Sequence, residues 1–434
     1  MLTRLDLRGT PTDGPDLRSR LPRPQVALEP PIAAVQAILG AVQERGDAAL
    51  AEFTARFDGV EVDPADLRVP ASELEAALAA TPPLLREALE AARANILAYH
   101  REQLREDVRH ERDGIVVREM RRPVDRAGLY VPRALAPLVS TVLMTAVPAR
   151  VAGVPEVVLV SAPGPDGQVA PGILAAAALA EVDEVYKVGG AHAIGALAFG
   201  TETIRPVDVI VGPGNVYVSQ AKREVAARGL VGVPSSFPGP SEVVVIADET
   251  TPADFAAIDL MVQVEHGPDG LAWLITWSED VADRITESVQ KLLEDAPRRD
   301  IIEKNLNTNS YVALVDDAEA AVAVANAIAP EHLELMTADP DALVGLVRHA
   351  GAVFCGAYAP ASVGDYLAGP NHVLPTYGTA RFAGALRVDD FVKYLHVVTL
   401  DEATLARVAP HVAAIAEAEG LPAHAESVRL RWAR

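Results

Sequence analysis

The chain has 434 residues, of which half are hydrophobic and 23% are charged, as is typical of a globular protein with more than one domain. Its 60 acidic residues outnumber the 38 Lys and Arg residues and give a formal net charge of −22, so we expect no nucleic acid and no anionic membrane as a partner. No run of about 18 apolar residues is present, and the N-terminus lacks the apolar core of a signal peptide. The single cysteine, Cys355, excludes an internal disulfide and lies in an apolar run. We therefore expect a cytoplasmic protein in which Cys355 is buried.

The first third of the chain predicts helices followed by extended structure. Residues 31–57 and 70–108 are rich in Ala, Leu, Glu and Arg and have the periodicity of amphipathic helices. Residues 111–124 are charged and β-branched, which indicates a hairpin or a linker.

From residue 154 onward, apolar strands alternate with helices. This βαβ pattern predicts an α/β fold built on open, mostly parallel sheets with helices on both faces. After residue 379 the pattern is mixed and includes a helix at 401–419. The predicted strands fall into two series, 154–161, 184–188 and 207–211, then 242–248, 271–277, 310–316 and 351–357.

Two glycine-rich turns follow predicted strands of the first series. They are Gly189-Gly190 and the segment 212–215, and each precedes a predicted helix, where backbone N–H groups can face a ligand. Neither turn has the G-x-G-x-x-G spacing of a dinucleotide-binding loop. On the pattern alone, both are interpreted as ordinary strand-to-helix turns.

A carboxylate and an imidazole stand side by side at Glu331-His332. Pro330 is expected to end the apolar helix 318–328, which places the pair where a helix passes into a loop. A neighbouring Glu and His can divide proton transfer, one activating water and the other accepting a proton from an alcohol. The alternative is that both are solvated loop residues.

The second half of the chain also carries residues that suit a metal ion. Gln263 and His266 lie three apart near a helix end and hence on one face, and Asp365 and His372 flank a Gly/Pro turn. Imidazole, carboxylate and amide donors form a nitrogen/oxygen site suited to zinc. Spacing alone does not show that these side chains converge, so separate polar residues remain the alternative.

Four blocks of the sequence together resemble the histidinol dehydrogenase family. The resemblance extends from about Asp125 to His424, and the blocks occur in the family's order and at its spacings. The blocks are Ala329-Pro-Glu-His-Leu-Glu334, Gln263-x-Glu-His-Gly-Pro-Asp269, Ser362-Val-Gly-Asp365 with Asn371-His-Val-Leu-Pro-Thr376, and Glu419-Gly-Leu-x-x-His424.

The resemblance implies a fold and an assembly. It implies two incomplete Rossmann-like parallel-sheet units with small helical N- and C-terminal segments, in an intertwined homodimer. The expected division is an N-terminal segment 1–30, a first unit of 31–129 plus 237–380, a second unit 130–236, and a C-terminal segment 381–434 exchanged onto the partner subunit.

The resemblance also implies a reaction and the residues that perform it. L-Histidinol is oxidised by two NAD to L-histidine through bound L-histidinal, with His332 as the general base and Glu331 activating water. Zinc is held by Gln263, His266, Asp365 and His424. The residues implied to contact the substrate are these four together with His332, Ser241, His372 and Glu419. NAD contacts fall on Tyr130, Asn215 and His192, the last standing where the family has a Gln.

The chain departs from the family at positions that border the implied clefts. Arg133-Ala134 replaces two glycines, His192 replaces the Gln, the stretch before Ser241 differs, and Arg387 stands where a small polar residue is common. The arginines suit an anionic substrate, so the alternative is a paralogue acting on another polar alcohol such as a sulfonated diol, whereas the carboxylate of Glu419 favours histidinol. Solvent-facing arginines are the other interpretation. A non-catalytic descendant would have lost Glu331 or His332, and both are present. NAD and NADP are not distinguished by these residues.

Overall fold

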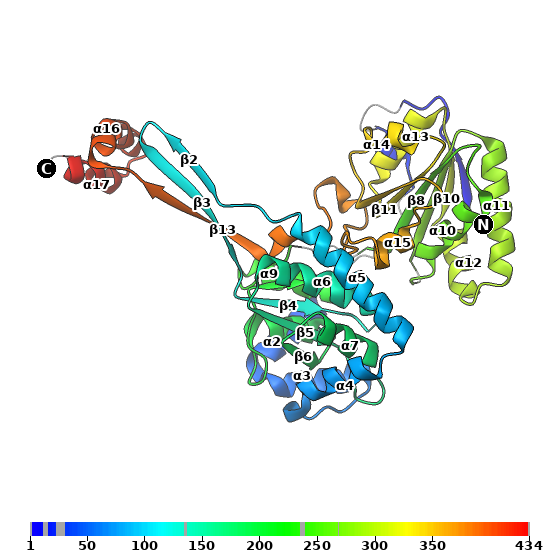
Figure 1. Ribbon diagram of the computed structural model, residues 1–434, viewed down its shortest axis with the longest axis horizontal. Helices are drawn as coiled ribbons and strands as arrows, with labels where there is room; N and C mark the ends of the chain where they lie inside the picture. The colour runs from blue at the N-terminus through cyan, green and yellow to red at the C-terminus, as the bar shows by residue number, and fades with distance from the viewer. Residues whose placement is uncertain are drawn as a thin grey trace.

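The computed structural model describes residues 2–11, 16–22, 31–133, 137–234, 239–267 and 269–432. Within them the chain forms two parallel sheets, each covered by helices, and a long antiparallel extension that projects away from both (Figure 1). The predicted α/β fold with open parallel sheets is confirmed. Across the described residues no helix is long and apolar enough to cross a membrane.

The larger sheet has six strands in the order β1-β10-β9-β8-β11-β12, and every neighbouring pair is parallel. Helices α10, α11 and α12 bury their apolar sides on one face, and α1, α13 and α14 contribute to the core on the other. The strands are β1 (Thr3–Asp6), β8 (Glu242–Ala247), β9 (Leu271–Thr276), β10 (Tyr311–Leu314), β11 (His332–Met336) and β12 (Ala352–Cys355). The helices are α1 (Asp16–Arg20), α10 (Ala253–Val264), α11 (Glu279–Glu294), α12 (Arg299–Thr308), α13 (Ala318–Ile328) and α14 (Pro340–Val344).

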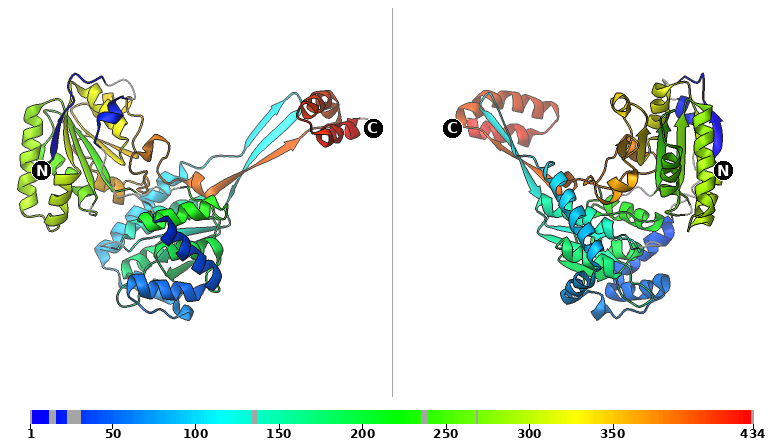
Figure 2. Two further views of the ribbon diagram at one scale, coloured as in Figure 1. Left: turned by 180° about the vertical axis from the view of Figure 1, so that it is seen from behind. Right: turned by 45° about the vertical axis from the view of Figure 1, so that its right-hand side comes forward.

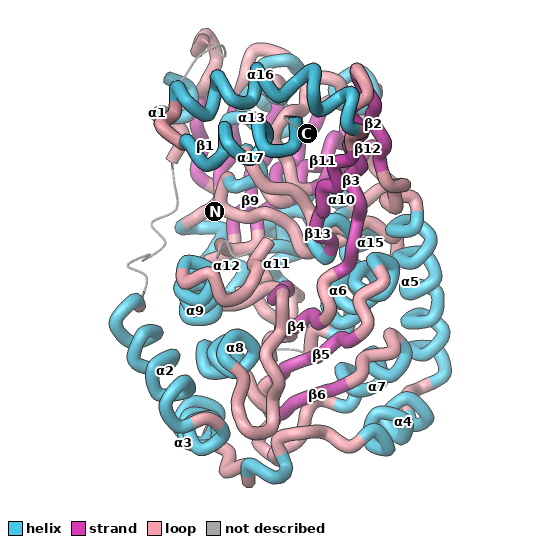
Figure 3. Tube along the Cα trace, turned by 90° about the vertical axis from the view of Figure 1, so that its left-hand side faces the viewer, coloured by secondary structure: helices cyan, strands magenta, loops and turns pink. Residues whose placement is uncertain are grey.

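The smaller sheet has four parallel strands in the order β6-β5-β4-β7. Figure 3 shows its helices in two layers, with α4, α5, α6 and α7 on one side and α2, α3, α8 and α9 on the other. The strands are β4 (Arg126–Tyr130), β5 (Glu156–Ser161), β6 (Glu184–Lys187) and β7 (Val209–Val211). The helices are α2 (Ile32–Arg45), α3 (Asp47–Asp58), α4 (Ala71–Ala80), α5 (Pro83–Arg101), α6 (Val139–Ala152), α7 (Pro171–Leu179), α8 (Gly190–Phe199) and α9 (Val216–Ala227).

The packing of the N-terminal helices differs from the predicted division of the chain. We expected residues 31–129 to join 237–380 in one unit, but α2 packs against α8, α4 against α7 and α5 against α6. Residues such as Val35, Leu39 and Ile96 are buried in the cores of the four-stranded sheet. These helices therefore belong with β4–β7, whereas the N-terminal strand β1 extends the six-stranded sheet.

The extension is a three-stranded antiparallel ribbon that ends in two helices. It contains β2 (Val108–Arg112), β3 (Ile115–Pro123) and β13 (Val392–Thr399), in the order β13-β3-β2, followed by α16 (Glu402–Ala418) and α17 (Pro422–Trp432). The views in Figure 2 show the helix pair at the end of this ribbon, well away from the sheets. The predicted hairpin and the helix at 401–419 are confirmed, whereas β13 was not predicted.

The remaining elements are short. They are the helix α15 (Ala361–Tyr366) and the 3-10 turns η1 (Pro64–Asp66), η2 (Thr379–Arg381) and η3 (Val388–Phe391). Cys355 ends β12, the outermost strand of its sheet, and its side chain is exposed, so the predicted burial is wrong.

Candidate active site

Glu331 and His332 lie at the start of a buried strand rather than in a loop. Helix α13 ends at Ile328, and Ala329 adopts a left-handed conformation (φ 57°) that turns the chain into the sheet before Pro330. His332 is the first residue of β11, which runs between β8 and β12. Both side chains are buried, with 8% exposure for Glu331 and 2% for His332. The alternative of solvated loop residues is therefore wrong.

The alternation of side chains along β11 separates its apolar and polar residues. Leu333 and Leu335 enter the core that also contains α13, so His332 and Glu334 point to the opposite face of the sheet. There the Glu334 carboxylate accepts a hydrogen bond of 3.0 Å from the amide of Ala361, the first residue of α15. This contact ties β11 to the helix that carries Asp365.

The imidazole of His332 is surrounded by oxygen atoms. Its Nδ1 lies 3.2 Å from the carbonyl oxygen of Glu242 and 3.6 Å from Oε2 of Glu331, and its Nε2 lies 3.2 Å from Oδ1 of Asp365. Burial opposes charging of the ring, but Glu331 and Asp365 outweigh it and raise the pKa of His332 well above its usual value. In this arrangement both ring nitrogens donate.

His372 connects the two units at the same place. Its Nδ1 lies 2.8 Å from the backbone oxygen of Asp365, and its Nε2 lies 3.3 Å from Oγ1 of Thr141 in α6 of the four-stranded unit. Burial lowers the pKa of His372, with a further lowering from His332, so the ring is neutral and takes part as a hydrogen-bonding group.

Three of the four predicted zinc ligands lie in the six-stranded unit. Gln263 is buried near the end of α10, and its amide nitrogen has no hydrogen-bond partner among the described residues. His266 follows the helix and is exposed. Burial of the Asp365 carboxyl acts to raise its pKa, but His332, His372 and His266 outweigh this and lower it, which keeps the carboxylate charged.

These residues suit a zinc ion but do not complete a site for it. A buried amide without a hydrogen-bond partner, a charged carboxylate and an imidazole are the donor groups of a nitrogen/oxygen zinc site. Among the described side chains, no group of three or more His, Cys, Asp or Glu could hold a metal. The predicted fourth ligand, His424, is exposed on α17, and Glu419 is exposed where α16 ends, both at the far end of the extension.

The predicted cofactor residues lie at the carboxyl ends of the strands of the smaller sheet. Tyr130 ends β4, and its hydroxyl accepts a hydrogen bond of 3.1 Å from the amide of Gly190, which begins α8. Burial raises the pKa of Tyr130 to about 12, so the hydroxyl keeps its proton. Asn215 caps α9 through hydrogen bonds of 3.1 Å from two backbone amides. Lys222 of α9 is buried and donates to the carbonyl oxygen of Gly212.

His192, in contrast, is a core residue of α8. Its ring is 0% exposed and packs against Phe53 and Phe57, with ring centroids 5.8 and 6.1 Å away. Its Nε2 lies 3.4 Å from Oγ1 of Thr54, and burial lowers its pKa to about 3. The neutral ring fills the space behind Gly190, where an added Cβ would meet it at 3.1 Å.

Two cavities open at this junction of the units. One, of about 150 Å³, is lined by the Gly212–Gly214 turn of the four-stranded unit and by Ser241, Glu331 and His372. It brings the predicted cofactor turn against the predicted catalytic and substrate residues. The other, of about 530 Å³, lies on the far side of His372 and is lined by Phe354, Asp365 and Arg387, among others.

The two arginines that depart from the family pattern have local partners. Arg133 donates from Nη1 to the carbonyl oxygen of Pro163 at 2.6 Å, and it also acts on the half-buried Asp58. Arg387 lines the larger cavity, but its Nε lies 3.4 Å from Asp389. Ala134 lies outside the described residues.

Comparison with known proteins agrees with the motifs. The family model for histidinol dehydrogenase matches residues 21–432. The chain is 50% identical to the histidinol dehydrogenase of Parasynechococcus marenigrum over 92% of this chain and 90% of that protein. It is 48% identical to that of Geobacillus kaustophilus over 92% and 93%. The crystal structure of the Elizabethkingia anophelis histidinol dehydrogenase, at 34% identity, superposes with a TM-score of 0.92 and covers 99% of this chain and 98% of that one. The predicted resemblance is confirmed, and the chain belongs to the histidinol dehydrogenase family.

Proposed function

We propose that this protein oxidises L-histidinol to L-histidine in two NAD-dependent hydride transfers, with the intermediate aldehyde held between them. The supporting observation is the buried Glu331–His332 pair beside Asp365, in which Glu331 lines, with His372, a cavity shared with the Gly212–Gly214 turn. The reaction is biosynthetic, and the reducing cytoplasm suits a chain with one exposed thiol.

The first step oxidises the alcohol. A hydride leaves the carbinol carbon for NAD while the hydroxyl proton passes to Nε2 of His332. This nitrogen lies 3.2 Å from Oδ1 of Asp365, one of the residues that would hold zinc. A bound zinc would draw negative charge away from this carboxylate, which would favour proton acceptance by the imidazole.

The second step oxidises the aldehyde after hydration. Glu331 removes a proton from water as the water oxygen bonds to the aldehyde carbon, which gives the anion of the hydrate. The hydrate then loses a hydride to a second NAD and a proton to His332 and leaves as a carboxylate. Glu331 is oriented for this task because its Oε2 accepts a hydrogen bond of 3.0 Å from the backbone amide of Glu242.

Zinc would be held by Gln263, His266 and Asp365 together with His424 of the partner subunit. When bound, it supplies a fixed template for the imidazole and amine of the substrate. Ser241 and His372, which line the shared cavity, contact the substrate from this chain. Glu419 reaches it from the second copy of the extension.

A homodimer follows from the same proposal. The extension keeps many apolar side chains exposed in one chain, including Leu395, Val398, Ile415 and Leu430. Ile415 is 63% exposed and Val398 is 60% exposed, values that are unusual for aliphatic side chains with no covering surface. A second copy that receives the extension covers these side chains and brings His424 and Glu419 to the site.

NAD is proposed to bind along the carboxyl ends of β4, β6 and β7. Tyr130 and Asn215 hold the turns that face it, and the amides at the start of α8 and α9 favour its pyrophosphate. Because His192 is fully buried, we propose that it supports the Gly190 turn from behind.

The test is the number of NADH molecules formed per L-histidinol consumed to completion, with zinc-loaded and chelator-treated protein. Two NADH, lost on chelation and restored by zinc, are expected. Absence of turnover by folded, zinc-loaded protein would contradict the proposal. A sulfonated diol serves as the competing substrate, because Arg387 lines the larger cavity and shares its partner Asp389 with Arg121.

A further inference from the structure

Glu242 lies next to the Glu331–His332 pair, and only its backbone amide has a role in the chemistry described so far. It is the first residue of β8, the strand next to β11, and its side chain is 4% exposed. A carboxyl group buried to this extent is costly unless hydrogen bonds compensate for the loss of water. Its partners therefore indicate what it does.

Glu242 and Glu331 hold each other reciprocally. The amide of Glu242 donates to Oε2 of Glu331 at 3.0 Å, and the amide of Glu331 donates to Oε1 of Glu242 at 3.2 Å. The carbonyl oxygen of Glu242 also lies 3.2 Å from Nδ1 of His332. Backbone and side chain of this one residue thus contact both predicted catalytic residues.

The same carboxyl group organises the loop that follows His372. Tyr377 and Gly378 are both left-handed, with φ of 56° and 73°, and the amides of both donate to Glu242, that of Tyr377 at 2.9 Å. Successive amides in such a turn form a concave anion site. A left-handed conformation is unfavourable for tyrosine, so this turn depends on its acceptor.

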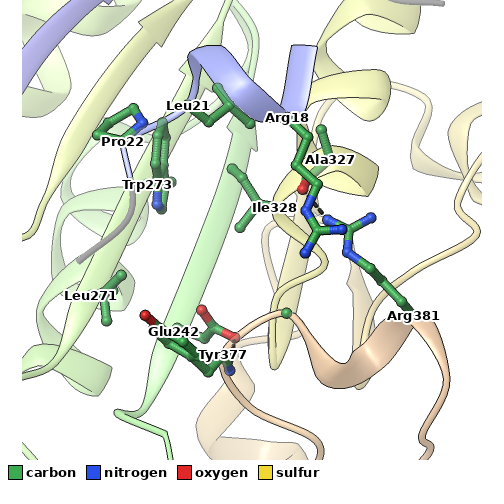
Figure 4. A pocket seen from close by; sticks show the side chains of 11 residues that line it. Arg18, Leu21, Pro22, Glu242, Leu271, Trp273, Ala327, Ile328, Tyr377 and Arg381 are labelled. Atoms are coloured by element: carbon green, nitrogen blue, oxygen red, sulfur yellow. Dashed lines mark hydrogen bonds between the residues drawn. The ribbon is translucent and has the colours of Figure 1, made fainter. Parts of the chain in front are cut away.

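The surroundings of the carboxyl group include charges of both signs. Figure 4 shows Glu242 beside Tyr377 on one wall of a cavity of about 70 Å³, with Arg18 and Arg381 on the opposite wall. Burial and the neighbouring Glu331 raise the pKa of Glu242 to about 8, while the amides of Gly378, Tyr377 and Glu331 act to lower it. At neutral pH the group is therefore an uncharged neighbour of Glu331.

We propose that Glu242 is a positioning residue that fixes the Glu331 carboxylate for hydration of the aldehyde. This inference rests on the proposed role of Glu331. Loss of the side chain frees the Glu331 backbone and the Tyr377–Gly378 turn, so the carboxylate no longer has one orientation toward the aldehyde carbon. Alcohol oxidation depends on His332, which strand β11 still holds in the sheet, so that step is affected less.

The test compares the two half-reactions in variants of the full-length, zinc-loaded protein. NADH formation is followed from L-histidinal, and aldehyde formation is followed from L-histidinol in a single turnover. In Glu242→Ala, aldehyde oxidation is expected to fall about 10- to 100-fold in kcat, with KM and alcohol oxidation within about threefold of wild type. In Glu242→Gln, which keeps an uncharged acceptor, both half-reactions are expected within about threefold at pH 7.

Two controls separate the possible failures. Glu294→Ala removes an exposed carboxylate of the same unit and should change neither half-reaction. Glu331→Gln tests the underlying role, and normal aldehyde oxidation by it would overturn the proposed function itself. If Glu331→Gln is impaired but Glu242→Ala behaves as Glu294→Ala does, or loses both half-reactions equally, the positioning role of Glu242 is wrong. If Glu242→Ala does not fold, Glu242→Asp, whose side chain is one methylene shorter, replaces it, and the same selective loss of aldehyde oxidation is expected.

Discussion

Glu331 and His332 are adjacent in sequence, but the structure gives them different partners and hence separable roles. Glu331 is held by the backbone of β8, whereas His332 faces Asp365 in α15. Glu331→Gln is expected to stop the reaction after one NADH per histidinol and to release aldehyde, because the water is no longer activated. His332→Asn is expected to lower the rate of aldehyde formation itself, by about 10²- to 10⁴-fold. Product analysis alongside the NADH count distinguishes the two variants.

A second prediction at the residue scale concerns stability against pH. The pKa of Glu242 is raised to about 8 in the folded protein, mainly by burial, and returns to its usual value near 4.5 on unfolding. The folded state therefore binds the extra proton between these values, and stability falls as pH rises through this window, by up to about 1.4 kcal/mol per pH unit.

The measurement for this prediction is the melting temperature of wild type and Glu242→Gln at pH 5, 6, 7 and 8. Other ionisable groups contribute equally to both proteins, so the difference isolates Glu242. The wild type is expected to lose stability relative to the variant as pH rises. If the melting temperatures of the two proteins change with pH in parallel, the Glu242 carboxyl group does not bind a proton in this range.

At the same scale, the sequence predicted residue types better than residue surroundings. Family motifs named Glu331, His332 and Asp365, and the structure brings these three together. Glu242 and Phe354 were missed, because each lies in an apolar strand and carries no spacing signal. The signal for Glu242 was a charged residue at the start of a strand that is otherwise Val, Ile and Ala.

At the scale of elements, β11 was the main failure of prediction. No strand was predicted at residues 332–336. These five residues include a His and a Glu, whereas a buried parallel strand is expected to be a continuous apolar run. The structure accommodates it because His332 and Glu334 share one face of the strand and find partners on α15. Strands with nearly continuous apolar sequences, such as β8 and β9, were predicted within one residue.

The packing of α15 on β12 gives a prediction at this scale. A Cβ on Gly364 would lie 2.7 Å from Cζ of Phe354, whose ring stacks on His332 with centroids 6.0 Å apart. Gly364→Ala must displace this ring and disturb its stacking on the imidazole, so it should destabilise the protein by about 1–3 kcal/mol and lower kcat.

Gly345→Ala is the matched control, because no atom lies within 4 Å of its added Cβ and its φ of −63° suits alanine. It is expected to stay within about 0.5 kcal/mol of wild type. Urea unfolding and steady-state kinetics of the two variants provide the comparison. Equal stability and equal kcat of the two variants would show that Phe354 can move aside without loss of stability or activity.

At the scale of the whole molecule, strand–helix alternation predicted the fold class, but it did not assign the N-terminal helices to a sheet. Periodicity shows which face of a helix is buried and not against which partner, so α2–α5 were placed with the wrong unit. The sequence also did not predict that the extension projects away from both sheets. Alternation of residues indicates that a segment forms strands, but it does not show where the ribbon points.

The separation of His424 from Glu331 in one chain leads to a prediction about mixed assemblies. Glu331→Gln and His424→Ala are each expected to form no L-histidine alone, although Glu331→Gln still releases the aldehyde. If they are refolded together, half of the dimers combine one chain of each kind and contain one intact site, so activity returns to about a quarter of wild type. No recovery, with mixed dimers verified by two different tags, would show that His424 serves its own chain.

The helix pair at the end of the extension has a further consequence. Its own buried cluster consists of only three alanines, Ala413, Ala416 and Ala425, with Val428 packed against them. Such a pair has too little apolar contact to persist alone, so its order depends on the surface that receives it. If that surface belongs to a second copy, as proposed above, the last stage of folding is bimolecular, and recovery of activity after dilution from denaturant should be second order in protein at low concentration.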